Sequence, residues 1–134
     1  MLSASTLELL ESFQEISNAT YDQGGLLYTY TEAANQAHFR YPLPQIVATH
    51  LSAQELDELG RFIEASQGSY QCESASIQFH SLAQKLIDSL LSDLKFNEVV
   101  WSFEDGGHYM NASIKMARRL DNRFFSLELM WSVD

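Results

Sequence analysis

Apolar residues recur at every third or fourth position in three separate stretches of the chain, and this spacing predicts three amphipathic helices. The first should begin at the capping-box signal 5–8 (Ser-Thr-Leu-Glu) and end near Asn18, and the second should begin at another capping box, 52–55 (Ser-Ala-Gln-Glu). The third should be capped near Ser81, and residues 76–80 suit either a short strand or its first turn. The three apolar stripes are Leu9, Leu10, Phe13 and Ile16; Leu56, Leu59 and Ile63; and Leu82, Leu86, Ile87, Leu90, Leu91 and Leu94.

In the last third of the chain the apolar period changes to two, which predicts strands. These strands should form a three-stranded antiparallel meander at about 98–104, 109–118 and 124–133. With two-residue turns at 106–107 and 121–122, Trp101 lies opposite Ala112, and Ala112 lies opposite Trp131. Both turns therefore assign the same face of the middle strand to the core.

The N-terminal half should add a small hairpin made from 26–31 (LLYTYT) and 37–42 (AHFRYP), which are rich in residues suited to strands. Residues 65–76 are small and polar and predict a long surface loop. The predicted fold class is therefore α+β, as a single domain over 1–134, with the meander packed on helices and the small N-terminal hairpin beside it.

The string EDGGHY, residues 104–109, has the most site-like composition in the chain and lies at the first turn of the meander. Its two glycines suit the positive φ of a tight hairpin turn, and the predicted register places Asp105 opposite His108 at an exposed tip. The register at the second turn places Lys115 opposite Glu128. Because a hairpin tip offers no dry pocket or second ligand, we interpret the string as a turn whose charged residues are open to a partner.

No catalytic residue, cofactor site or metal site is predicted. The four histidines match no zinc-ligand spacing, Cys72 lies in a polar segment, and phosphate-binding and nucleophile-elbow motifs are absent. One cysteine excludes an intramolecular disulfide and fits a reducing compartment. Since the first residues also lack the pattern of a signal peptide, we expect a cytoplasmic protein.

The chain is strongly acidic, with 18 acidic and 8 basic residues, a net charge of −10 and an isoelectric point near 4.6. Such a charge repels phosphate backbones and anionic membranes, so direct binding to nucleic acid or to a membrane is disfavoured. The acidity is concentrated in residues 1–80, which contain ten acidic and two basic residues. This imbalance favours a basic protein as the partner, with plain solubility as the alternative explanation.

Several residues are candidates for partner binding. They are Glu55, Asp57, Glu58 and Glu64 of the second helix, Tyr28, Tyr30 and Tyr41 of the first hairpin, and Asp105 and His108 of the meander turn. Each has a structural alternative: carboxylates near a helix start interact favourably with its dipole, and tyrosines on a strand are often half-buried. The polar outer face of the meander is interrupted by Val100, Phe124 and Met130. These residues form either a contact strip for a partner or a site that the N-terminal segment covers.

These patterns predict a non-enzymatic binding protein, monomeric or homodimeric, that masks another protein with acidic and aromatic surface. Its most concrete form is an immunity protein or antitoxin that neutralises a basic toxin such as a nuclease. The length, acidity and alternation of helices and strands resemble type III secretion chaperones and small bacterial immunity proteins, although a C-terminal helix of the chaperone kind is not indicated. The alternatives are a secretion chaperone, an inhibitor that mimics nucleic acid, and a small ligand-binding domain or enzyme with a pocket between sheet and helices.

Overall fold

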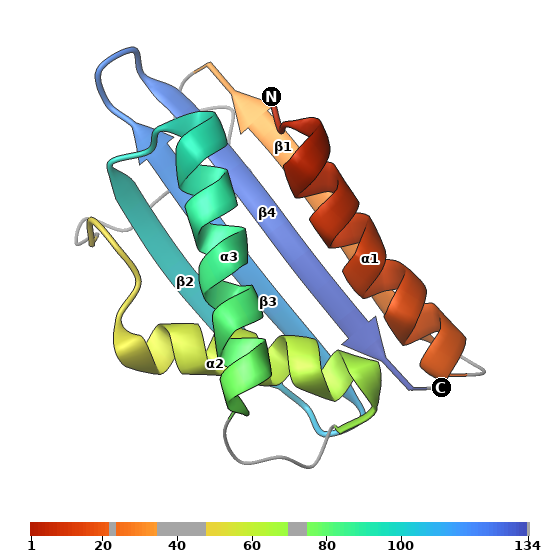
Figure 1. Ribbon diagram of the computed structural model, residues 1–134. Coiled ribbons are helices and arrows are strands. Elements are labelled where there is room, and N and C mark those ends of the chain that lie inside the picture. Colours follow the sequence, from red (N-terminus) through yellow and green to blue (C-terminus); the bar gives the residue numbers. More distant parts are fainter. Residues whose placement is uncertain (22–23, 35–47, 70–74, 134) are drawn as a thin grey trace.

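The computed structural model describes residues 1–21, 24–34, 48–69 and 75–133, and it has the predicted α+β class (Figure 1). Along the chain its elements are α1 (Ala4–Thr20), β1 (Gly25–Ala33), α2 (Ala53–Glu64), the π-helical segment η2 (Ala65–Ser69), α3 (Ile77–Leu94), β2 (Glu98–Asp105), β3 (Tyr109–Arg118) and β4 (Arg123–Ser132).

The sheet has four antiparallel strands in the order β1-β4-β3-β2, so the prediction of a three-stranded meander is corrected. The predicted strands are β2, β3 and β4, and the fourth is β1, which pairs with β4 over its full length. Local hairpin rules had assigned 26–31 to a separate hairpin, but pairing with β4 satisfies an edge that would otherwise remain open. The second strand proposed for that hairpin, 37–42, lies outside the described residues.

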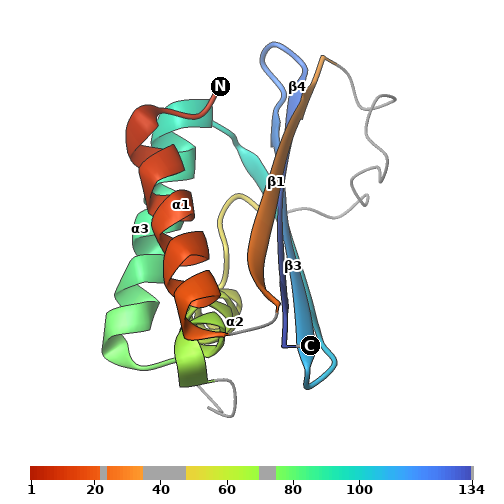
Figure 2. The same ribbon diagram turned by 90° about the vertical axis from the view of Figure 1, so that its right-hand side faces the viewer.

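The described helices all lie on one face of the sheet (Figure 2). Alternate residues of each strand point toward them and join one apolar core, which includes Leu26, Val99, Ile114 and Leu127. The helix stripes agree with the prediction except at Leu91 of α3, which is 45% exposed, and in α1. There Ile16 is 46% exposed, and the buried positions are Thr6, Leu10, Phe13 and Ser17.

The predicted capping box at the start of α2 is confirmed, with Ser52 and Glu55 exchanging side-chain and backbone hydrogen bonds. In α1, by contrast, the cap is Ser3 and not Ser5. Ser3 has a tertiary partner, because its backbone N–H and its hydroxyl both contact the Asp93 carboxylate of α3. A local capping signal could not reveal that contact.

The boundary before α3 also differs from the prediction. The helix begins at Ile77 with Ser76 as its N-cap, so 76–80 is its first turn and Ser81 lies inside it. The Ser76 backbone N–H donates to Glu64 of α2 (2.9 Å), which connects the two helices at this point. The predicted loop at 65–76 begins as η2, in which Ser66 is buried.

Both predicted hairpin registers are wrong by two residues, although the buried face is correct. Trp101 pairs with Ile114, and Ala112 pairs with Leu129. A shift of two keeps every side chain on its own face, so hydrophobic alternation alone could not detect it. Consequently Lys115 lies opposite Ser126, and Glu128 opposite Ser113.

The two turns explain the shift. The first is centred one residue later than predicted, with the Gly106 N–H donating to the Tyr109 carbonyl (2.9 Å). Asp105 therefore pairs with Met110 rather than with His108. The second turn takes four residues, 119–122, between the last paired residues of β3 and β4.

Candidate functional site

The face of the sheet opposite the helices is formed by the other alternate residues of the four strands (Figure 2). We call it the outer face. Near the β3–β4 turn it carries an apolar cluster in which Ala117 and Phe124 are buried and Val100 packs against them. Of the predicted contact strip, Phe124 is thus only 1% exposed, whereas Met130 is 41% exposed.

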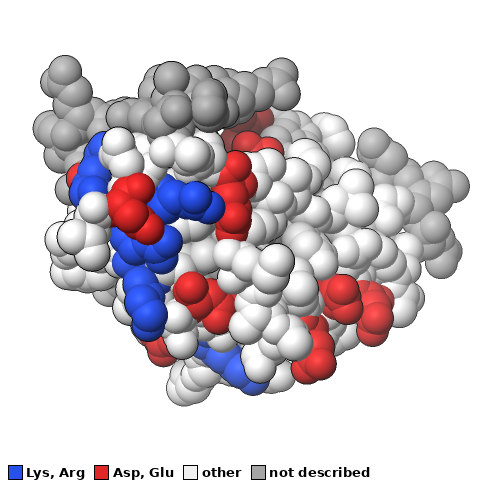
Figure 3. All heavy atoms as spheres, turned by 90° about the horizontal axis from the view of Figure 1, so that it is seen from above, with Lys and Arg blue, Asp and Glu red and all other residues white. Residues whose placement is uncertain are grey.

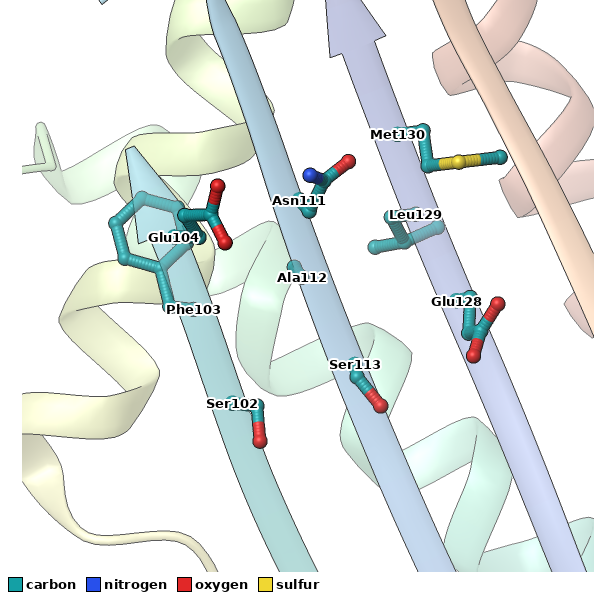
Figure 4. Close-up of a pocket in the computed structure, with 9 residues that line it drawn as sticks. All are labelled: Ser102, Phe103, Glu104, Asn111, Ala112, Ser113, Glu128, Leu129 and Met130. Carbon is teal, nitrogen blue, oxygen red and sulfur yellow. The ribbon is translucent and has the colours of Figure 1, made fainter. Parts of the chain in front are cut away.

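Nearer the β2–β3 hairpin the outer face contains an open hollow of about 390 Å³ (Figure 4). Its lining residues are Ser102, Phe103, Glu104, Asn111, Ala112, Ser113, Glu128, Leu129 and Met130. The polar ones stand in two cross-strand rows, Ser102-Ser113-Glu128 and Glu104-Asn111, and the second row continues to the apolar Met130. The hollow thus brings together hydroxyl, amide and carboxylate groups from three strands.

Carboxylates border this hollow on both sides, with Glu104 on β2 and Glu128 on β4 (Figure 4). The hydroxyl of Tyr109 donates to Glu104 (2.7 Å), and this hydrogen bond raises the pKa of Tyr109. Lys115 lies on the same face, where burial lowers its pKa and the nearby charge of Glu128 opposes that shift. Between the two carboxylates, the Ser113 hydroxyl is buried and has no hydrogen-bond partner among the described residues.

Beside Met130, the outer face also carries an apolar spot. Leu27 of β1 lies directly opposite Met130 of β4, and these side chains are 57% and 41% exposed.

The basic side chains are concentrated elsewhere. Lys and Arg gather at the end of the molecule that includes the β3–β4 turn, interspersed with carboxylates (Figure 3). There Arg118 forms two hydrogen bonds to Asp121, and Arg119 contacts Glu98 while its guanidinium lies over Phe124. The hollow is therefore separated along the sheet from the basic end.

A second group of side chains meets where α2 approaches β2. Trp101 and Phe103 stack with their ring centroids 6.0 Å apart, and the Arg61 guanidinium lies 5.2 Å from the Phe103 centroid. Glu58 accepts from the Trp101 indole (3.5 Å), and Arg61 forms an ion pair with Asp105 (3.7 Å). The predicted residues Glu58 and Asp105 are thus brought to one place. Sequence reasoning assigned Trp101 to the core, and no local signal connects it with α2.

The other three predicted carboxylates of α2 have structural partners. Glu55 completes the capping box, Asp57 accepts from the Ala75 N–H (3.2 Å), and Glu64 accepts from the Ser76 N–H (2.9 Å). They hold the helix start and the beginning of α3, so together they do not form one free acidic face.

The remaining predicted residues are dispersed. Tyr28 and Tyr30 are half-buried on the helix side of β1, where burial raises the pKa of each, and the Tyr30 hydroxyl donates to Glu32 (2.6 Å). His108 is exposed at the hairpin tip, edge-on to the Tyr109 ring. Tyr41 lies outside the described residues.

Within the described ranges, no three His, Cys, Asp or Glu side chains are arranged to hold a metal ion. None of the described helices has the length and apolar character needed to cross a membrane.

Comparisons with models of known protein families, with curated proteins and with solved structures find no match to this chain.

Proposed function

We propose that this protein is a non-enzymatic binding protein that receives a basic partner protein on the outer face of its sheet. The observation that carries the proposal is the hollow, which is bordered by Glu104 and Glu128 and adjoins exposed Met130 and Leu27. Protein interfaces combine apolar contact area with a polar border, and the outer face offers both side by side.

Charge supports a basic partner. The chain carries a net charge of −10, and its described basic residues are concentrated at the β3–β4 turn and not at the hollow. Lys115 is the one described strand residue that brings a positive charge to the outer face, and Glu128 lies near enough to act on it. Opposite charge speeds the encounter of two proteins and discriminates against acidic competitors.

The concrete form of this proposal is an immunity protein or antitoxin that masks a basic toxin, for which fast capture is an advantage. A secretion chaperone would use the same face to hold an unfolded segment, and a nucleic-acid mimic would need carboxylates in an ordered line. Since three of the four α2 carboxylates hold the protein's own backbone, mimicry is the less favoured alternative.

One observation favours a second candidate, a domain that binds a small polar ligand in the hollow. In the part of the chain that the structure describes, the Ser113 hydroxyl is buried without a partner beside Ser102, Asn111 and Glu128, and unsatisfied polar groups in a concave site suit a hydroxylated ligand. The hollow is not lined by Asp105, His108 or His80, and Cys72 lies outside the described residues, so an enzymatic role gains no support from it.

The test is capture from native-host extract with immobilised protein, comparing wild type with the double variant Glu104→Gln, Glu128→Gln. The matched control is Glu8→Gln, Glu15→Gln, which removes the same charge from exposed positions of α1. We expect a basic protein to be retained by wild type and by the control, and to be retained at least about tenfold more weakly by the outer-face variant.

Equal retention by all three proteins would refute the use of the outer face. If no protein is retained and the purified chain instead carries a small molecule, the ligand-binding candidate replaces the proposal.

A further inference from the structure

The strand β2 forms one edge of the sheet, and part of this edge is open among the described residues. At one point it already has a partner, because Ala48 and Val99 form an isolated antiparallel bridge with N–H···O distances of 3.4 and 2.8 Å. In this antiparallel bridge, the residues that would continue the pairing along 100–105 are those before Ala48, and residues 35–47 lie outside the described residues. Among the described residues, pairing on this side of β2 is limited to the bridge at Val99.

The backbone groups beyond this bridge face the same way. Alternate residues of a strand direct their N–H and C=O groups to the same side, so those of Trp101, Phe103 and Asp105 point away from β3 as Val99 does. Natural proteins protect such edges with proline, lysine or a covering segment, and residues 100–105 contain neither proline nor lysine.

The charges along β2 decide which strand could pair there. All its charged residues are acidic: Glu98, Glu104 and Asp105. A second copy of this strand would place carboxylates near carboxylates, which disfavours self-pairing. Pairing with a basic strand is favoured instead, because Glu104 is exposed on the outer face and would lie beside the basic side chains of that strand.

The two faces of the edge differ in what they accept. On the helix side, Trp101 and Phe103 are only partly buried, so this side offers contact to apolar side chains, and the Glu58 and Asp105 carboxylates there already have Trp101 and Arg61 as partners. On the outer side, Ser102 and Glu104 end the two rows that line the hollow. An added strand would extend those rows with basic side chains.

We propose that a segment of the basic partner adds to β2 as a fifth, antiparallel strand along 100–105, with apolar residues toward the helices and Lys or Arg toward the outer face. The inference rests on the proposed function and specifies how the partner is held. Main-chain hydrogen bonds would supply affinity, and the alternation of side chains would supply specificity.

The probe for this mode is a short peptide of alternating lysine and valine, acetylated and amidated at its ends, added to the protein and followed by NMR. In the proposed register the valine N–H groups pair with the edge, because residues directly opposite Trp101 and Phe103 share their side-chain face. Methylation of the valine amide nitrogens should weaken binding at least about tenfold, whereas methylation of the lysine amide nitrogens, as the matched control, should not.

A protein variant tests the same edge. Ser102→Lys places a positive charge beside the added strand, and its control, Thr29→Lys, places the same charge at the other end of the same cross-strand row. We expect Ser102→Lys alone to weaken the peptide at least about tenfold, and the amides of Trp101, Phe103 and Asp105 to exchange more slowly in the wild-type complex.

The results separate this inference from the proposed function. If both methylated peptides still bind, and if the NMR chemical-shift changes are confined to Asn111, Ser113 and Glu128, strand addition is overturned. The outer-face proposal would then still stand. Failure of the alternating peptide to bind better than a block isomer of the same composition would also overturn strand addition. The proposed function would then still be judged independently by the Glu104→Gln, Glu128→Gln capture.

Discussion

Replacement of Asp93 by Asn tests how the two long helices are held together. The Asp93 carboxylate of α3 accepts from the Ser3 N–H (3.0 Å), the Ser3 hydroxyl (3.1 Å) and the Thr6 hydroxyl (2.5 Å) at the start of α1. Burial alone would raise the pKa of Asp93, but these hydrogen bonds outweigh it and hold the pKa below its ordinary value of 3.8.

Two effects of Asp93→Asn oppose each other. Asn keeps an acceptor oxygen but loses the charge, and hydrogen bonds to a charged group contribute about 1.5–3 kcal/mol where neutral ones contribute about 1 kcal/mol. Against this loss, removing a negative charge from the last turn of α3 relieves an unfavourable interaction with the helix dipole of about 0.3–1 kcal/mol. Because Asp93 is partly exposed, we expect a net loss of about 1 kcal/mol in the free energy of unfolding at pH 7.

The pH dependence gives the sharper measurement. A carboxylate whose pKa is lower in the folded state contributes stability above its unfolded pKa, and this stability is lost as the pH falls through the folded pKa. The difference between wild type and Asp93→Asn should therefore be largest near neutral pH and should vanish once the pH lies well below the ordinary value of 3.8.

Urea denaturation followed by circular dichroism, at several pH values, measures this difference. Asp88→Asn is the matched control, because Asp88 lies on the same helix and contacts only exposed Gln84 among its hydrogen-bond partners in the described structure. Its effect should stay below about 0.5 kcal/mol. A pH-independent loss for Asp93→Asn, or a loss no larger than the control's, would refute the reasoning.

Three further predictions concern single side chains, each measured by urea denaturation. Ser3→Ala should lower the free energy of unfolding by about 1 kcal/mol and Ser5→Ala by less than about 0.5 kcal/mol, since Ser3 is the N-cap of α1. The reverse order would show that Ser5, the cap inferred from the sequence, is the actual cap. Gly106→Ala should cost about 1 kcal/mol or more, because its Cβ would lie 2.0 Å from the Tyr109 ring, and Gly106→Ala should lose this penalty in a Tyr109→Ala background. Ser113→Ala should be neutral or stabilising by up to about 1 kcal/mol, since it removes a buried hydroxyl that has no partner among the described residues; a clear loss would show that the hydroxyl has one.

For the candidate site, the sequence predicted on which face of the sheet each residue lies, but not which residues lie opposite one another. Hydrophobic alternation placed Ser102, Glu104 and Ser113 on the outer face, and they are there. Which of them lie opposite one another depended on the two turns, and both registers were off by two residues. Since a shift of two preserves the face, the pattern of apolar residues carries no information about it.

The sequence by itself determined the α+β class, the helix faces apart from a rotation in α1 and the exposed Leu91 in α3, the capping box at Ser52 and the buried side of the meander, because each depends on residues close together in the chain. Only the tertiary structure decided that β1 completes the sheet beside β4, that Asp93 selects Ser3 as a cap, and that Glu58 and Asp105 meet around Trp101. These contacts join residues distant in the chain, and their free energy depends on packing and on the satisfaction of edge and cap groups in the complete fold. The hollow, and the part of the β2 edge that the described residues leave unpaired, belong to that second kind of information, which is why they emerge only from the folded chain.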